Sequence, residues 1–171
     1  MNRRAGHTLL EMLSVLAVAA LLLGMAAPSL QALVQRQRLI TTANDFFAAV
    51  TLTRSEALRR GTPVVLLASG AGWDSGWMVL VDRNGNLRPD GGEDIVASHG
   101  PPPAGIAITS NFNDNRVPHI AYGANGRSRS GSGSAQAGSF EFRAGDLRRR
   151  IIVNLLGRPR ACNPERDRSA C

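Results

Sequence analysis

The sequence has no lysine, only two cysteines and a single tyrosine in 171 residues. All 20 strongly basic side chains are therefore arginines, which keep their charge throughout the physiological pH range. The formal net charge is +7, a balance that favours acidic partners without identifying one. Aromatic residues make up 5% of the chain, and none accompanies the arginines near the C-terminus. Recognition of bases by stacking is therefore not expected there.

The sequence also lacks the residue patterns of an active site. His99 and His119 have neither a cysteine nor a carboxylate at metal-ligand spacing. Serines are plentiful, but none lies in a nucleophile elbow or in another catalytic motif. We therefore expect a protein that is not an enzyme and that holds no cofactor.

One segment matches a calcium-binding loop in part. Side chains with oxygen donors occupy positions one, three, five, nine and twelve of such a loop: Asp82, Asn84, Asn86, Asp90 and Glu93. Position six requires a glycine for its sharp turn, and Leu87 stands there instead. The alternatives are a cation site and an Asx-rich connection whose side chains bond their own backbone. The missing glycine favours the second alternative, so we expect no metal.

Charge is distributed unevenly along the chain. Between residues 61 and 126, three arginines face six acidic residues, which gives −3. From residue 127 to the end, ten arginines face four acidic residues, which gives +6. Any anion-binding surface is therefore expected in the last third of the chain.

Long apolar runs are confined to the first quarter of the chain. The segment 12–34 is apolar and long enough to span a membrane. Glu11 lies at its start, although a carboxylate in a spanning segment costs roughly 2.5–3.5 kcal/mol. Arg3 and Arg4 favour a cytoplasmic N-terminus, with the rest of the chain on the outer side.

These N-terminal residues resemble the class III signal of type IV pilins and type II secretion pseudopilins. The match comprises a basic leader, Gly6, Thr8–Leu9, Glu11 and the apolar helix behind them. The resemblance implies that a prepilin peptidase cuts after Gly6 and removes the leader 1–6. It also implies methylation of the new N-terminal amine at His7, where the family usually has Phe.

The resemblance implies that the charge of Glu11 is neutralised by the new N-terminal amine of a neighbouring subunit during assembly, which lowers the cost of the carboxylate in lipid. The alternative is an uncleaved anchor in which Glu11 snorkels to the membrane interface. The resemblance implies a location in the bacterial inner membrane, with the C-terminal domain in the periplasm. The chain would then enter a pilus or pseudopilus filament made of other pilins or pseudopilins.

The sequence predicts one long helix from about Thr8 to Arg60. Residues 7–34 form its transmembrane and assembly part, and residues 35–60 continue it with apolar residues at helical spacing. Pro28 removes a backbone hydrogen bond, so a break or loosening is expected between Gly24 and Pro28. Two arginines, a glycine and a proline then provide a strong C-terminal stop.

Residues 61–171 predict an all-β domain of two small antiparallel sheets, which gives an α+β fold together with the helix. Seven β-like runs are separated by turn residues: 64–68, 76–81, 94–98, 106–109, 119–122, 139–143 and 149–156. The segment 126–138 is rich in glycine and serine with no large apolar residue, so we expect a mobile loop.

The two cysteines, Cys162 and Cys171, lie in a short C-terminal tail that has little core to hold it. A disulfide between them is the expected staple, with two free thiols as the alternative. It would require an oxidising compartment and would stabilise the fold by about 2–3 kcal/mol.

The arginines of the tail suggest a phosphate-binding surface. Arg158 and Arg160 project to the same side of an extended chain at a spacing of about 6.6 Å. This is about two phosphate steps of ~3.4 Å along one strand of duplex DNA. Arg148, Arg149 and Arg150 at the last predicted strand would assist. The alternative is a solvated basic strand end, or one that contacts acidic residues of neighbouring subunits.

Two further segments refine the resemblance. Residues 76–86, with the sequence GWMVLVDRNGN, resemble the signature of the GspH/FimT group of pseudopilins. Gly157-Arg158-Pro159-Arg160, followed by Cys162, resembles the GRxR tail of FimT-type minor pilins. That tail implies non-specific capture of DNA during natural transformation. The competing function is a structural minor pseudopilin of a type II secretion system, whose arginines contact other subunits or an exported protein.

Overall fold

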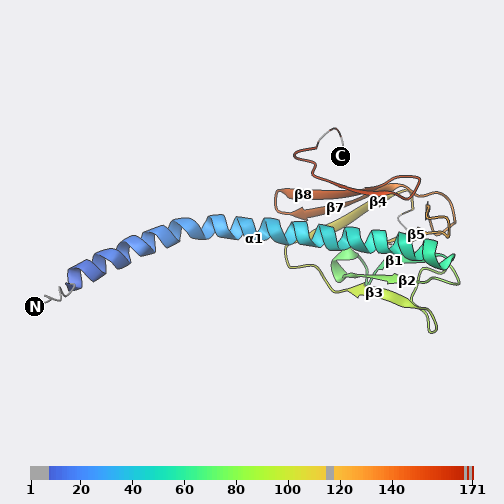
Figure 1. Cartoon of the computed structure of the whole chain (residues 1–171), viewed down its shortest axis with the longest axis horizontal. Coiled ribbons are helices and arrows are strands. Elements are labelled where there is room, and N and C mark those ends of the chain that lie inside the picture. Colours follow the sequence, from blue (N-terminus) through green and yellow to red (C-terminus); the bar gives the residue numbers. More distant parts are fainter. Residues whose placement is uncertain (1–7, 115–117, 168, 170) are drawn as a thin grey trace, which may run out of the picture. The chain divides into compact units, whose positions relative to one another are not determined.

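The computed structural model describes residues 8–114, 118–167, 169 and 171, and of residues 25–28 it describes the backbone only. A single long helix, α1 (Leu9–Arg60), precedes the strands (Figure 1). This confirms the predicted helix within one residue of its expected start. Thr8 caps it: its Oγ1 accepts the N–H of Glu11 at 3.2 Å, and its carbonyl accepts the N–H of Met12 at 3.2 Å.

The chain divides into two compact units, Met1–Gln37 and Arg38–Cys171. In the first unit the large apolar side chains of α1 are exposed, including Leu9 at 82% and Leu21 at 71%. This part of α1 is long and apolar enough to cross a membrane, and none of its described side chains is buried within the structure. The backbone of α1 is not interrupted at Gly24 or Pro28. The predicted loosening there stays a prediction.

In the second unit, one face of α1 is buried. The buried positions alternate four and three residues apart, the spacing that keeps side chains on one side of a helix. They are Leu39, Ala43, Phe46, Val50, Thr53 and Ala57, and Thr42 beside Ala43 is buried as well. Thr53 satisfies its hydroxyl by donating to the carbonyl of Ala49 at 2.7 Å. Gly61, with φ of 64°, ends the helix in the left-handed conformation expected of a C-terminal glycine.

Two antiparallel sheets follow α1 in the second unit, with a short 3-10 helix, η1 (Trp73–Ser75), between the first two strands (Figure 1). The first has the order β3-β2-β1-β5-β6. Its strands are β1 (Val64–Ala68), β2 (Trp77–Leu80), β3 (Ile95–His99), β5 (His119–Tyr122) and β6 (Ser128–Arg129). The second has the order β4-β7-β8-β9. Its strands are β4 (Ala107–Phe112), β7 (Gly138–Ala144), β8 (Leu147–Val153) and β9 (Pro159–Cys162).

One core joins α1 to both sheets, and Phe46 lies at its centre. Its ring centroid is 4.6–5.3 Å from four others, those of Trp73, Trp77, Phe140 and Phe142. Edge-on and tilted ring pairs of this kind are favourable beyond their buried area. The α+β prediction of a long helix on two small antiparallel sheets is therefore confirmed.

The structure corrects the prediction for residues 126–138. This segment is not a mobile loop, because it contains β6 and a further bridge between Arg129 and Ala135. Ser128 and Gln136 are fully buried although both are polar. Ser128 donates its hydroxyl to the carbonyl of Gln136 at 2.5 Å, which satisfies the buried polar group. Composition alone did not reveal these hydrogen bonds.

An ion-pair network at the end of α1 makes stability depend on pH. Arg59 and Arg60 donate to the carboxylate of Glu56 at 2.6 and 2.7 Å and lower its pKa from 4.5 to about 2. A depressed folded-state pKa stabilises the fold above the unfolded value and loses this effect as pH falls. We expect the urea midpoint to fall more between pH 4.5 and 2 in the native chain than in Glu56→Gln. Equal losses in both chains would contradict this assignment.

Candidate functional site

The tail arginines lie on an ordered hairpin. β9 pairs with β8, with Ile152 opposite Arg160, and the N–H of Asn154 donates to the carbonyl of Arg158 at 3.3 Å. Arg160 lies in β9, whereas Arg158 lies just before it, at the end of the turn. Both side chains are exposed. The sequence predicts a last strand over residues 149–156. In the structure this strand, β8, ends at Val153, because the chain turns at 154–158 and returns as β9.

Gly157 brings this hairpin turn against a second turn. Its φ is 73°, and a Cβ atom there would lie 2.5 Å from the carbonyl oxygen of Gly126 and 2.8 Å from the N of Ser128. Only glycine allows the two backbones to approach this closely. Arg54 of α1 fixes the same place, because its Nε–H donates to the carbonyl of Gly126 at 2.9 Å. The glycine of the GRPR segment therefore has a structural role.

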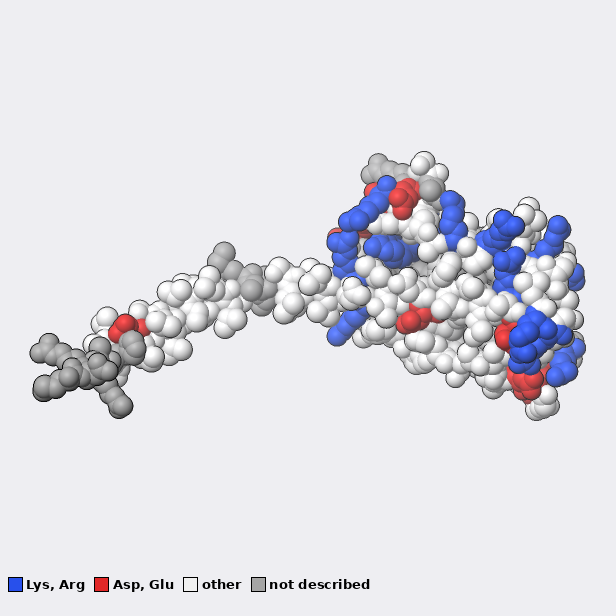
Figure 2. Space-filling view, viewed as in Figure 1, with Lys and Arg blue, Asp and Glu red and all other residues white. Residues whose placement is uncertain are grey.

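This contact adds arginines that the sequence pattern did not assign to the site. Arg127 and Arg129 on the β5–β6 segment are exposed, as Arg158 and Arg160 are. Among the described residues, no ion pair involves any of these four side chains. Figure 2 shows arginines gathered over the globular part, with acidic side chains beside only some of them. The sequence signal, a net +6 from residue 127 onward, included Arg127 but could not place it.

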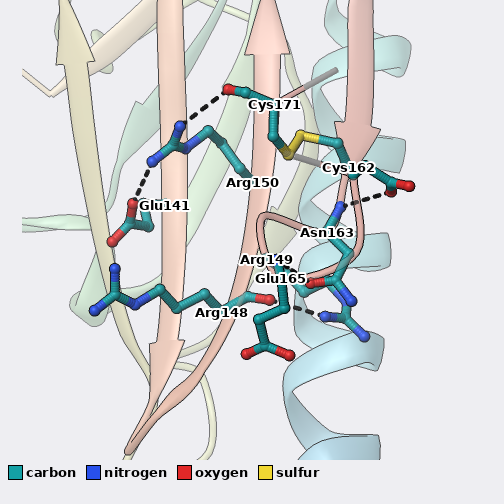
Figure 3. The surroundings of a disulfide bond; sticks show 9 residues. Glu141, Arg148, Arg149, Arg150, Cys162, Asn163, Glu165 and Cys171 are labelled. Atoms are coloured by element: carbon teal, nitrogen blue, oxygen red, sulfur yellow. Dashed lines mark hydrogen bonds and ion pairs between the residues drawn. A yellow bond between two sulfur atoms is a disulfide. The ribbon is translucent and has the colours of Figure 1, made fainter. Parts of the chain in front are cut away.

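The run Arg148–Arg150 does not form one surface. Strand alternation puts Arg149 on the opposite face of β8 from Arg148 and Arg150. Arg150 donates to Glu141 at 2.8 Å and to the carbonyl of Cys171 at 3.1 Å (Figure 3). The guanidinium of Arg150 lowers the pKa of the Glu141 carboxyl. The prediction that all three assist one ligand is therefore wrong in its geometry, because Arg149 faces away and Arg150 ties the tail to β7.

The predicted disulfide between Cys162 and Cys171 is present, with Cα atoms 5.9 Å apart (Figure 3). It closes the segment that follows β9. Within that segment the carbonyl of Asn163 accepts the N–H of Asp167 at 2.8 Å. The disulfide and the Arg150 contacts hold the C-terminal end against the sheet that carries the tail arginines.

The calcium-like segment folds as an Asx-rich connection. The carboxylate of Asp82 accepts the N–H groups of Gly85 and Leu87, at 2.7 and 3.0 Å. Leu87 has φ of 59°, the conformation that glycine takes at this position of a calcium loop. Its side chain packs against a second apolar cluster formed by Val65, Leu67 and Leu80, which gives a leucine at this position a structural role. In the described ranges, no group of three His, Cys, Asp or Glu residues could hold a metal.

The residues of the N-terminal signal are only partly described. Gly6 and His7 lie outside the described residues. Glu11 lies in the first turn of α1 and is exposed. An acidic residue in the first turn is favourable for the helix dipole. Cleavage, methylation and neutralisation of Glu11 stay predictions.

Two family models match the chain. A model described as the prokaryotic N-terminal methylation motif matches residues 1–27. A model described as type II transport protein GspH matches residues 42–157, which is more than half of the sequence. The chain belongs to the GspH family. This confirms the resemblance to type IV pilins and pseudopilins, and such families are structural proteins, as expected for a chain that is not an enzyme.

Individual relatives agree with the GspH assignment. The chain is 42% identical over 98 residues to the pilin-like protein PilA1 of Thermus thermophilus, covering 56% of this chain and 60% of that protein. The GspH-family fold is also found in the type IV minor pilin FimU of Pseudomonas aeruginosa. That match has a TM-score of 0.59 and 18% identity over 77% of this chain and 92% of FimU.

A secretion-system protein shares the fold as well. The minor pseudopilin EpsH of the type 2 secretion system of Vibrio cholerae matches with a TM-score of 0.56 and 12% identity. The match covers 74% of this chain and 98% of EpsH. At these identities the two structures establish the pilin fold, and the fold is common to pili and secretion systems. A minor pilin or pseudopilin is therefore supported, and the choice between them depends on the site.

Proposed function

We propose that this chain is a minor pilin of a type IV pilus that binds DNA non-specifically through its C-terminal arginines during natural transformation. The observation that carries the proposal is the pair Arg158 and Arg160, exposed at the start of the β9 side of a hydrogen-bonded hairpin and free of ion pairs within the described residues. Guanidinium groups bind phosphates well, and such contacts do not read base sequence. No base preference is therefore expected.

Binding should show the salt dependence of phosphate contacts. With the full-length protein in lipid nanodiscs and a labelled duplex, we expect Arg158→Gln with Arg160→Gln to weaken binding and to reduce the slope of log K against log salt by about 1.8. The matched control is Arg83→Gln with Arg88→Gln, the same charge change on exposed residues of another segment. Equal slopes for both pairs, or no binding at low salt, would rule out DNA as the ligand of the tail.

A second candidate function is a structural pseudopilin that contacts other subunits or an exported protein. One observation favours it: Leu155 and Leu156 are 57% and 47% exposed beside the tail. They line a cleft of about 620 Å³ together with Ile152 and Arg150. In that case Leu155→Ser with Leu156→Ser should reduce incorporation of the protein into filaments. Arg158→Gln with Arg160→Gln should then leave DNA binding unchanged. Normal incorporation of the leucine variant would exclude this function.

We further propose processing by a prepilin peptidase at the inner membrane, with the C-terminal domain in the periplasm. In cells that carry the peptidase, Gly6→Leu should leave full-length precursor in the membrane, because glycine suits the cut by presenting no side chain and leucine does not. Glu11→Val should be cut normally but be depleted from sheared filaments, since its pairing with an N-terminal amine is lost. Normal maturation of the Gly6 variant, or normal incorporation of the Glu11 variant, would contradict the respective role.

A further inference from the structure

We propose that the turn between β5 and β6 supplies a second set of phosphate contacts, centred on Arg127, and that the ligand is duplex DNA held across two turns. This proposal rests on the proposed DNA-binding function and adds residues outside the C-terminal tail. Arg127 lies far from Arg158 in the sequence. The structure joins the two turns through the contact of Gly157 with Gly126 and Ser128.

The two arginines lie close enough to act on one ligand. The backbone contact at Gly157 leaves the Cα atoms of Arg127 and Arg158 no more than about 11 Å apart, given standard bond lengths. Long side chains add reach at both ends. The grooves of B-form DNA are about 6 and 12 Å wide. One duplex can therefore receive both guanidinium groups, on phosphates of one strand or on either side of a groove.

Both turns are held rigid by their own hydrogen bonds. In the hairpin turn, the side-chain oxygen of Asn154 accepts the N–H groups of Leu156 and Arg158, each at 3.0 Å. In the other turn, the side-chain oxygen of Asn125 accepts the N–H of Arg127 at 3.1 Å, and the carbonyl of Arg127 accepts the N–H of Gly123 at 3.0 Å. A fixed backbone lowers the entropy lost when the arginines engage a ligand.

The arginines on these turns are also uncompensated. Some other arginines of the described residues have carboxylate partners: Arg59 and Arg60 pair with Glu56, and Arg150 pairs with Glu141. Arg127, Arg129, Arg158 and Arg160 have no such partner there. Arg54 adds a further positive charge beneath Gly126. A phosphate arriving at this surface therefore displaces no internal carboxylate.

The burial of the aromatic rings favours duplex over single-stranded DNA. Proteins that hold single strands usually stack bases on exposed rings. In this chain every aromatic side chain is buried except Phe47 of α1, which is partly buried. Tyr122 lies directly beneath Gly157 and is fully buried, so its ring cannot receive a base. Phosphate contacts at a fixed spacing remain, and these suit a stiff duplex.

The test compares single arginine variants of the full-length protein in nanodiscs, with duplex and single-stranded DNA carrying the same number of phosphates. Arg127→Gln should reduce the salt slope for the duplex by about 0.9, as Arg158→Gln does, because each removes one phosphate contact. Arg88→Gln, which changes an exposed arginine outside the two turns, should leave the slope unchanged. The duplex should bind at least as tightly as the single strand.

The outcomes separate this inference from the proposed function. If the Arg158 and Arg160 variants bind as the native chain does, DNA binding by the tail itself fails. If these variants lose affinity while Arg127→Gln matches Arg88→Gln, only the second turn is excluded. A clear preference for single-stranded DNA overturns the assignment of a duplex. A circular dichroism spectrum identical to that of the native chain confirms that Arg127→Gln is folded.

Discussion

Replacing Phe46 by alanine is expected to lower the free energy of unfolding by about 3–5 kcal/mol, the usual cost of truncating a buried phenylalanine. Phe46 is 0% exposed and its ring contacts rings from both sheets. The variant therefore leaves a cavity where α1 and the two sheets meet. Domains of this size have only about 5–15 kcal/mol in total, so much of the variant would be unfolded at modest urea concentration.

The neighbouring residue provides a matched control for Phe46. Phe47 is only partly buried, so Phe47→Ala should cost clearly less than Phe46→Ala although the chemical change is identical. Trp73 and Trp77 lie beside the Phe46 ring, so their fluorescence reports the unfolding of this core directly. Equal losses in the two variants would show that the core is not centred on Phe46.

Gly157→Ala is expected to cost about 2–4 kcal/mol, because two penalties add at this position. The left-handed φ of 73° disfavours any side chain. The new Cβ would also press on the backbone of the facing turn, at 2.5 Å from the Gly126 oxygen, and backbone cannot rotate away as a side chain can. Urea denaturation measures the loss. DNA binding should weaken as well, because the turns that carry Arg127 and Arg158 must separate.

Gly133→Ala is the control that separates the backbone penalty at Gly157 from the packing penalty. Gly133 has φ of 83°, but a Cβ there would meet no atom within 4 Å. This variant therefore suffers only the backbone penalty of about 1–2 kcal/mol. The difference between the two variants measures the close approach at Gly157. If both lose the same stability, the contact between the two turns is not tight.

Residues with strong local signals were predicted correctly. The spacing of Leu39, Phe46 and Val50 predicts a buried helical face, and the two arginines before Gly61 predict where the helix ends. Both effects depend on neighbours within one or two turns, which a sequence window contains. The strand β1 and the Cys162–Cys171 disulfide are likewise local in sequence and were predicted.

Segments whose structure depends on distant partners were not predicted. β6 and β9 were missed because each is short and polar and forms only by pairing with a strand already in place. Residues 126–138 contain no large apolar side chain, yet Ser128 and Gln136 are buried through hydrogen bonds across the segment. Leu87 did not match a calcium loop because its side chain covers an apolar cluster on the first sheet.

The sequence by itself determined the family of this protein and how it is built: an N-terminal methylation motif, an apolar helix, a β domain, and a basic C-terminal third. These features depend on composition and short spacings. Only the tertiary structure decided which arginines can act together. Strand alternation separates Arg149 from Arg148, and a carboxylate occupies Arg150. The close approach at Gly157 brings Arg127 beside Arg158, because a glycine without a side chain lets two distant turns touch.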